Sequence, residues 1–187
     1  MRTHKPPVAL LAALALLALA ALVAGCGDNA KTSASGNATD AAFITDMTTH
    51  HRGAIEMAEV AQQRAVLPAM RKLADDIISA QEGQISVMTR IGDDMRAMGT
   101  HGGGHMDMSQ AELGMDVDMP TLRRAEPFDR AFIDMMVAHH QGAIAMAREQ
   151  LDKGSQPALR MMAQEIIEAQ TRENAQMRVW RKAGASP

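Results

Sequence analysis

Two adjacent histidines occur twice in this chain, each time in the same short motif. The motif is Met-x-x-His-His, followed six residues later by a second Met. Its eight members are Met47, His50, His51 and Met57, and Met136, His139, His140 and Met146. Imidazole nitrogen binds copper, zinc, iron and nickel, whereas thioether sulfur selects soft ions, Cu(I) above all. The motif therefore predicts a copper site, with silver or another soft ion as alternatives.

The spacing of the motif suits a helix. Residues three, four and seven apart share one face of a helix, so Met47, His50 and Met57 fall on one stripe. His51 lies about 100° around the axis, on the flank of that stripe. The second copy has the same spacing. If the two copies face each other inside a bundle, up to four imidazoles and four thioethers would meet there.

Core packing is the competing interpretation. Methionine fills hydrophobic cores, and a methionine stripe at helical spacing is more often core than ligand. The paired histidines are harder to explain in this way, because buried imidazoles need polar partners. We favour metal binding for the histidines. Core packing is favoured for seven methionines: Met57, Met70, Met88, Met146, Met161, Met162 and Met177.

The residue before each histidine pair bears on catalysis. Di-iron sites in helical bundles use Glu-x-x-His, with carboxylates bridging hard ions. Met47 and Met136 stand where that pattern requires glutamate. We therefore expect a binding protein rather than an enzyme. A ferritin-like metal oxidase and a metal-free structural or interaction domain are the alternatives.

A second group of histidines and methionines lies between the two copies of the motif. Residues 99–108 read GTHGGGHMDM, and the consecutive glycines exclude regular structure there. No hydrophobic core is evident in this segment, so we expect its methionines to be exposed. The segment predicts an accessory copper loop that captures or hands over the ion, through His101, His105, Met106 and Met108. The alternative is a low-complexity insert.

Some carboxylates are candidates for orienting a ligand. Asp76 and Glu165 occupy matching positions in the two halves and could face either solvent or a histidine N–H. Solvent is the favoured interpretation for both. Gln84 and Glu173 lie nearer the inward stripe of their helices and could orient an imidazole ring.

An internal repeat fixes the elements that must position these residues. Residues 40–58 and 129–147 are identical at twelve of nineteen positions, and the offset of 89 residues continues further along the chain. Each unit has two stretches of helical periodicity, so two units predict an all-α four-helix bundle built from duplicated hairpins. The predicted helices span 40–63, 67–97, 127–153 and 156–182, with a crossover at 98–126.

The N-terminus predicts export. A basic start, an apolar run of about 16 residues and small residues before Cys26 describe a signal peptide over 1–25, because a membrane span needs roughly 20 residues. Cys26 is the single cysteine and resembles the lipidated residue of a lipoprotein. An incidental cysteine or an uncut signal anchor are the alternatives. Residues 26–39 predict a flexible tether before a domain at 40–182.

Charge limits the partners. Removal of the signal peptide takes away Arg2 and Lys5, which leaves 17 basic and 22 acidic side chains. That balance argues against nucleic acid, which needs a basic surface. We expect a membrane attachment through the lipid, on the outer face of the cytoplasmic membrane or in the periplasm or cell envelope. A copper-transfer partner is also expected, and the sequence makes no prediction of oligomeric state.

Two segments, FITDMTTHHRGAIEMAEVA and FDRAFIDMMVAHHQGAIAMARE, are each followed by an AxxIIxAQ segment. Together they resemble the domain-of-unknown-function 305 family (DUF305) over about 40–182. The resemblance implies a ferritin-like four-helix fold, export from the cytoplasm and, for some members, copper binding and tolerance. It also implies that the eight motif residues form the site. Gln84 departs from the family, which tends to have glutamate there, as at Glu173. That departure implies a weaker first half-site.

Overall fold

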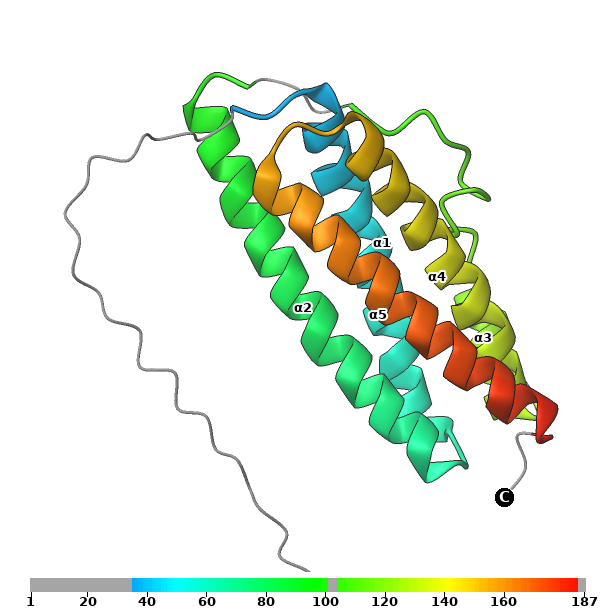
Figure 1. Ribbon diagram of the computed structural model, residues 1–187. Coiled ribbons are helices and arrows are strands. Elements are labelled where there is room, and N and C mark those ends of the chain that lie inside the picture. Colours follow the sequence, from blue (N-terminus) through cyan, green and yellow to red (C-terminus); the bar gives the residue numbers. More distant parts are fainter. Residues whose placement is uncertain (1–34, 101–103, 185–187) are drawn as a thin grey trace, which may run out of the picture. The chain divides into compact units, whose positions relative to one another are not determined.

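The computed structural model describes residues 35–100 and 104–184, and these form helices without any strand. Four long helices account for most of the described chain (Figure 1). The elements are α1 (Ala38–Arg64), α2 (Pro68–Ala97), α3 (Met119–Arg124), α4 (Phe128–Lys153) and α5 (Pro157–Lys182). The all-α prediction is confirmed, and the predicted ends of the four long helices agree to within two residues. The short α3 was not predicted.

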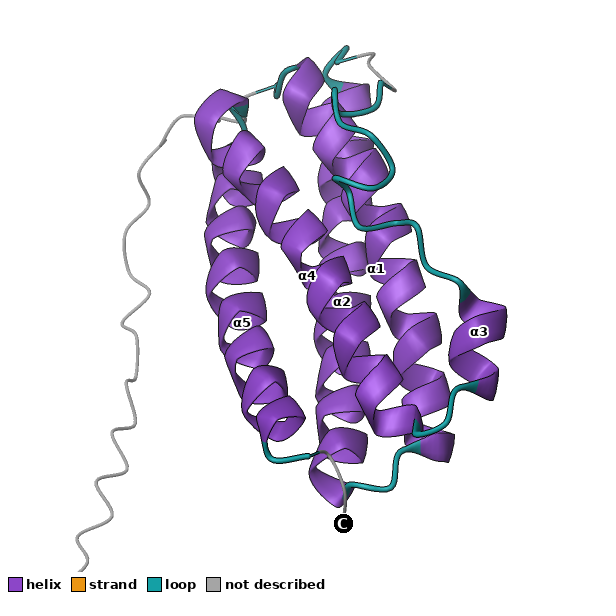
Figure 2. Ribbon diagram, turned by 90° about the vertical axis from the view of Figure 1, so that its right-hand side faces the viewer, coloured by secondary structure: helices purple, strands orange, loops and turns teal. Residues whose placement is uncertain are grey.

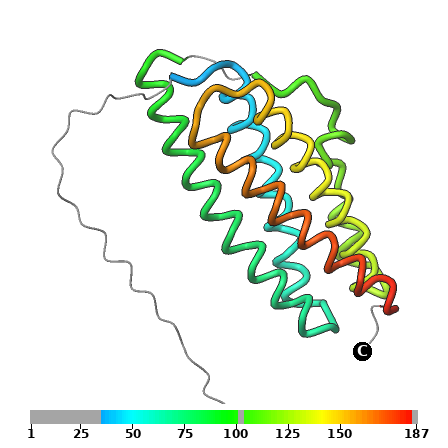
Figure 3. Tube along the Cα trace, viewed as in Figure 1, coloured from blue at the N-terminus to red at the C-terminus, as the bar shows by residue number. Residues whose placement is uncertain are grey.

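The long helices form two hairpins. α1 packs along α2 and α4 packs along α5, and the hairpins contact each other mainly through α1 and α4. α1 and α4 run in opposite directions, as the trace in Figure 3 shows. The fold is therefore a ferritin-like four-helix bundle made of duplicated hairpins. The connection between the hairpins descends along the outside of the bundle to α3 (Figure 2).

Local sequence explains where the helices begin. Asn37 caps α1: its side-chain oxygen accepts from the Asp40 N–H at 3.0 Å, and the Asp40 carboxylate accepts from the Asn37 N–H at 2.7 Å. This reciprocal capping box satisfies donors that a helix start leaves free. Pro68 and Pro157 stand in the first turns of α2 and α5, where a missing N–H costs nothing.

Two buried aspartates interlock the hairpins. Asp40 at the start of α1 accepts from the backbone N–H groups of the link 155–156 at 3.1 Å. Asp129, its counterpart in α4, accepts from those of the link 66–67 at 2.9 Å. The two contacts are related by the repeat offset. Each hairpin turn is thus held by the first turn of a helix in the other hairpin.

Methionine fills much of the core. Ten methionines are buried in the described part of the chain: Met47, Met57, Met70, Met88, Met95, Met106, Met136, Met146, Met162 and Met177. They pack with phenylalanine, alanine, leucine and isoleucine in two clusters. The core expectation is confirmed for six of the seven methionines. It is wrong for Met161, which is 65% exposed on α5.

Residues 104–118 form a strap across the outside of the bundle. Its first part is fixed by Asp46 of α1, whose carboxylate accepts from His105 Nδ1 at 2.5 Å and from the Met106 N–H at 2.6 Å. Its middle is fixed by Leu113, which is 2% exposed. Leu113 lies on Gly142 of α4 so closely that only glycine leaves room for its backbone.

The strap contains a turn that begins like a helix. Ser109 and Glu112 make the hydrogen bonds of a capping box, with the Ser109 N–H donating to the Glu112 carboxylate at 2.8 Å. The chain nevertheless continues as a turn over 110–114, and Gly114 adopts a φ of +68° there. This positive φ, which glycine adopts readily, ends the incipient helix after one turn.

The predicted signal peptide, Cys26 and most of the predicted tether lie outside the described residues, as does His101. Of the helices that the structure describes, none has both the length and the apolar character needed to cross a membrane.

Candidate metal centre

His50 and His139 meet where α1 packs against α4. Their ring centroids are 3.6 Å apart, and the ring planes are inclined by 39°. Both residues are 1% exposed, and the neighbouring His51 and His140 are 0% exposed. The antiparallel packing of the two helices therefore places four imidazoles in the interior, with the two inward-facing rings in direct contact.

The flanking rings are each oriented by a side chain of the partner helix in the same hairpin. His51 Nε2 lies 2.7 Å from Gln84 Oε1, and His140 Nε2 lies 2.7 Å from Glu173 Oε2. The oxygen accepts in both cases, so each Nε2 carries the hydrogen. Each ring then presents the lone pair of its Nδ1 atom. The two contacts are equivalent by the repeat, except that an amide replaces a carboxylate in the first half.

His50 has the same tautomer for a different reason. Its Nε2–H donates to the main-chain carbonyl oxygen of His139 at 2.9 Å, which leaves its Nδ1 with a lone pair. A ligating histidine usually donates its other ring N–H to a carboxylate or carbonyl, which fixes the ring and makes the free nitrogen more basic. Three of the four imidazoles therefore already have the hydrogen bond that a metal-binding histidine requires.

The remaining ring nitrogens have no partner. The Nδ1 atoms of all four histidines, and Nε2 of His139, are buried without a hydrogen bond in the described residues. A buried polar atom left in this way costs about 1–3 kcal/mol. A metal ion that accepts these lone pairs would remove that cost. The donor set consequently fits a metal that prefers imidazole.

Burial keeps His50, His51 and His139 neutral. It lowers the pKa of His50 to about 3, and repulsion from His51 and His140 adds to the effect. Burial likewise lowers the pKa of His51 to about 4, against a hydrogen bond to Gln84 Oε1 that raises it. The pKa of His139 lies well below its usual value for the same main reason. Imidazole must be deprotonated to bind a metal, so these three rings are ready to bind at neutral pH.

The motif methionines are all buried but do not gather at one point. Met57 and Met136 belong to one hydrophobic cluster, and Met47 and Met146 belong to the other. The division follows from the antiparallel helices, because residues before His50 in α1 face residues after His139 in α4. The sequence predicted that up to four thioethers and four imidazoles would meet at one site. The structure instead separates the sulfurs into two pairs.

The described residues contain no group of three or more His, Cys, Asp or Glu side chains arranged to hold a metal ion. This holds for the four buried histidines as well, of which His50 and His139 are the pair in direct ring contact. Of the three carboxylates considered from the sequence, only Glu173 lies at a histidine. Asp76 is exposed and pairs with Lys72, and Glu165 is also exposed.

The strap differs from its prediction. Met106 is buried in the core and Met108 packs against it, so the expectation of exposed methionines is wrong for Met106. His105 is held by Asp46, a buried carboxylate that the sequence analysis missed. The repeat gave no signal for it, because its counterpart in the second unit is Met135.

Comparison with known proteins shows the family of the chain. The profile of the family described as "Domain of unknown function (DUF305)" matches residues 33–181. No curated protein matches the chain.

Solved structures of two relatives are similar. CopM in its Cu(I)-bound form is 33% identical, with a TM-score of 0.67 over 79% of this chain and 98% of that chain. CopM in its Cu(II)-bound form is 34% identical, with a TM-score of 0.68 over 77% and 96%. CopM was also solved in an Ag-bound form. A DUF305 protein from Streptomyces coelicolor, described as secreted, is 26% identical, with a TM-score of 0.66 over 75% and 88%.

Proposed function

The chain belongs to the DUF305 family, and on that premise we propose that it binds copper as Cu(I) between its two hairpins. His50 and His139 would hold the ion, with His51 and His140 as further imidazole ligands. The observation that carries the proposal is the set of four buried rings whose Nδ1 atoms have no partner among the described residues.

The choice of copper rests on ligand chemistry and on the relatives. Thioether sulfur is available from Met47 and Met136, one helical turn before the histidines on α1 and α4. Thioether and imidazole together favour Cu(I), and Ag(I) is a chemically similar soft ion. The Cu(I)-bound, Cu(II)-bound and Ag-bound forms of CopM support the choice of copper as the metal.

The role we propose is sequestration, tolerance or transfer of copper outside the cytoplasm, without catalysis. A di-iron oxidase uses Glu-x-x-His, and Met47 and Met136 stand where that pattern requires glutamate. Export is supported by the relative described as secreted. We propose that Cys26 carries a lipid that attaches the protein to a membrane, and that His101, His105 and Met108 give the ion to a partner protein or take it from one.

The test is a Cu(I) titration of the purified protein against a competing chelator. We expect a sub-micromolar dissociation constant, which requires more than about 8 kcal/mol of binding free energy. The double variant His50→Leu/His139→Leu should lose that binding, and leucine keeps the core filled. The matched control is Met161→Leu on the exposed surface of α5. Unchanged affinity in the folded double variant, checked by circular dichroism, would refute the assignment.

A further inference from the structure

A cavity of about 270 Å³ separates the strap from the helices that carry the histidines. It is bounded by His50 and Glu56 of α1, by His139 of α4, and by Met115 and Met119, at the two ends of the segment 115–119 between the strap turn and α3. Both inward-facing imidazoles therefore border one cavity, and two thioethers border the same cavity from the opposite wall.

Burial alternates along this segment. Residues 115–118 belong to no helix or strand, and Met115, Val117 and Met119 are partly buried while Asp116 and Asp118 are exposed. Methionine thus faces the histidines, and carboxylate faces the solvent.

The segment is held at both ends. Leu113 is fixed on Gly142 before it, and Leu122 of α3 is fully buried after it. Met115 packs against one core cluster and Met119 against the other. Both methionines therefore line the cavity from a segment that is anchored at its two ends.

We propose that this cavity is a second copper subsite, a loading site in which Met115 and Met119 bind Cu(I) before it reaches His50 and His139. This inference rests on the proposed function of the histidines. The ion stays Cu(I) throughout, and it exchanges sulfur ligands for nitrogen ligands. The imidazoles are neutral, so the exchange releases no proton.

Two other cavities lack this combination of ligands. The first, of about 410 Å³, lies on the α4 side of the strap and also touches His139. Its lining contains the carboxylates of Asp116, Asp118 and Asp134 and one thioether, that of Met135. Carboxylate suits hard ions, so this cavity would attract cations without selecting copper.

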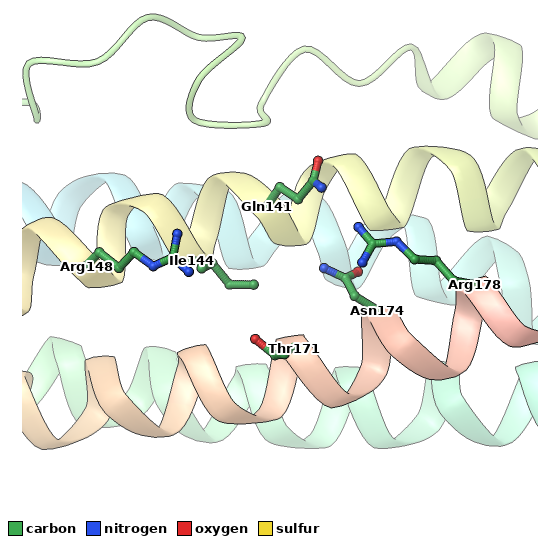
Figure 4. A pocket seen from close by; sticks show the side chains of 6 residues that line it. All are labelled: Gln141, Ile144, Arg148, Thr171, Asn174 and Arg178. Atoms are coloured by element: carbon green, nitrogen blue, oxygen red, sulfur yellow. The ribbon is translucent and has the colours of Figure 1, made fainter.

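The second is a groove of about 240 Å³ between α4 and α5. Its lining contains neither histidine nor methionine. Arg148 and Arg178 extend toward each other along it (Figure 4). Two guanidinium groups repel a cation, and this groove is excluded as a copper route.

The test measures how fast copper is loaded. Cu(I) is delivered from a chelator complex in a stopped-flow experiment, with the wild type, Met115→Leu/Met119→Leu, and Met161→Leu as the control. We expect the double variant to load about tenfold more slowly, the effect of about 1.4 kcal/mol in a barrier. Loading at the wild-type rate would overturn the proposal.

A second measurement separates this proposal from the first. In the His50→Leu/His139→Leu background, Ag(I) is added while the ¹³C-methyl NMR signals of methionine are recorded. We expect the Met115 and Met119 signals to shift first, because their thioethers still bind the soft ion. Absence of any shift there refutes the loading site even if the histidines prove to bind copper. If the His50→Leu/His139→Leu variant kept the copper affinity of the wild type, the histidine assignment would be refuted instead.

Discussion

Replacing Gly142 by alanine should lift the strap from α4. A Cβ atom at this position would lie 2.0 Å from the carbonyl oxygen of Leu113 and 2.6 Å from the backbone nitrogen of Gly114. Both contacts are with backbone atoms, so no side-chain rotation relieves them. The strap itself must move, and the buried Leu113 moves with it.

Two opposing free energies set the size of the effect. Alanine is favoured over glycine inside a helix by about 1 kcal/mol. Burial of a leucine side chain contributes about 1.5–3 kcal/mol, and a displaced strap loses most of it. The expected net result for Gly142→Ala is a loss of about 0.5–2 kcal/mol in the free energy of unfolding.

The assay is urea denaturation, with hydrogen exchange followed at the strap amides. Gly83→Ala is the control, because Gly83 lies exposed on α2 and a Cβ there meets nothing within 4 Å. We expect that control to gain up to about 1 kcal/mol. Faster exchange at Leu113 and Gly114 should accompany Gly142→Ala alone. If both variants were stabilised equally, the close approach of the strap would not exist.

Further expectations concern the histidines and the interlock. Gln84→Glu should tighten Cu(I) binding and Glu173→Gln should weaken it, each about tenfold, because the partner of a ligating ring tunes its basicity; a chelator titration that finds no change in either would contradict the orienting role. The metal-free protein should lose stability as pH falls from about 6.5 toward 3, because the unfolded His50 binds a proton that the folded one, with a pKa of about 3, refuses; urea denaturation across that range measures this, and His50→Leu should flatten the slope. Asp129→Ala should cost about 1–3 kcal/mol in thermal unfolding, since two partly buried N–H groups lose their acceptor, whereas the exposed Asp76→Ala should cost almost nothing; equal melting temperatures would show that the interlock contributes nothing.

The repeat explains why the sequence predicted the helices and the meeting of the histidines. An offset of 89 residues relates two similar hairpins, and similar hairpins pack most simply about a twofold axis. Equivalent residues near that axis, such as His50 and His139, must then face each other. The same symmetry predicted that Gln84 and Glu173 would occupy matching places.

The features that escaped prediction break the repeat or depend on the direction of the helices. The thioethers divide into two pairs because α1 and α4 are antiparallel, which the spacing within one helix does not reveal. Asp46 has Met135 as its counterpart, so its role in holding His105 left no repeated signal. The contact of Leu113 with Gly142 left no repeated signal either. Gly53 has the same repeat position, but a Cβ atom there would contact the ring of His139, at 3.3 Å, and no strap backbone.

The contacts of Asp40 and Asp129 with the turn of the opposite hairpin predict how half of this protein would behave alone. A single hairpin has an aspartate without the turn it serves and a turn without its aspartate. Two copies of one hairpin would satisfy both at once, as a twofold-symmetric homodimer with one histidine pair from each subunit at the centre. The present chain is in this sense a covalently joined dimer, and its halves should complement each other when expressed as separate pieces.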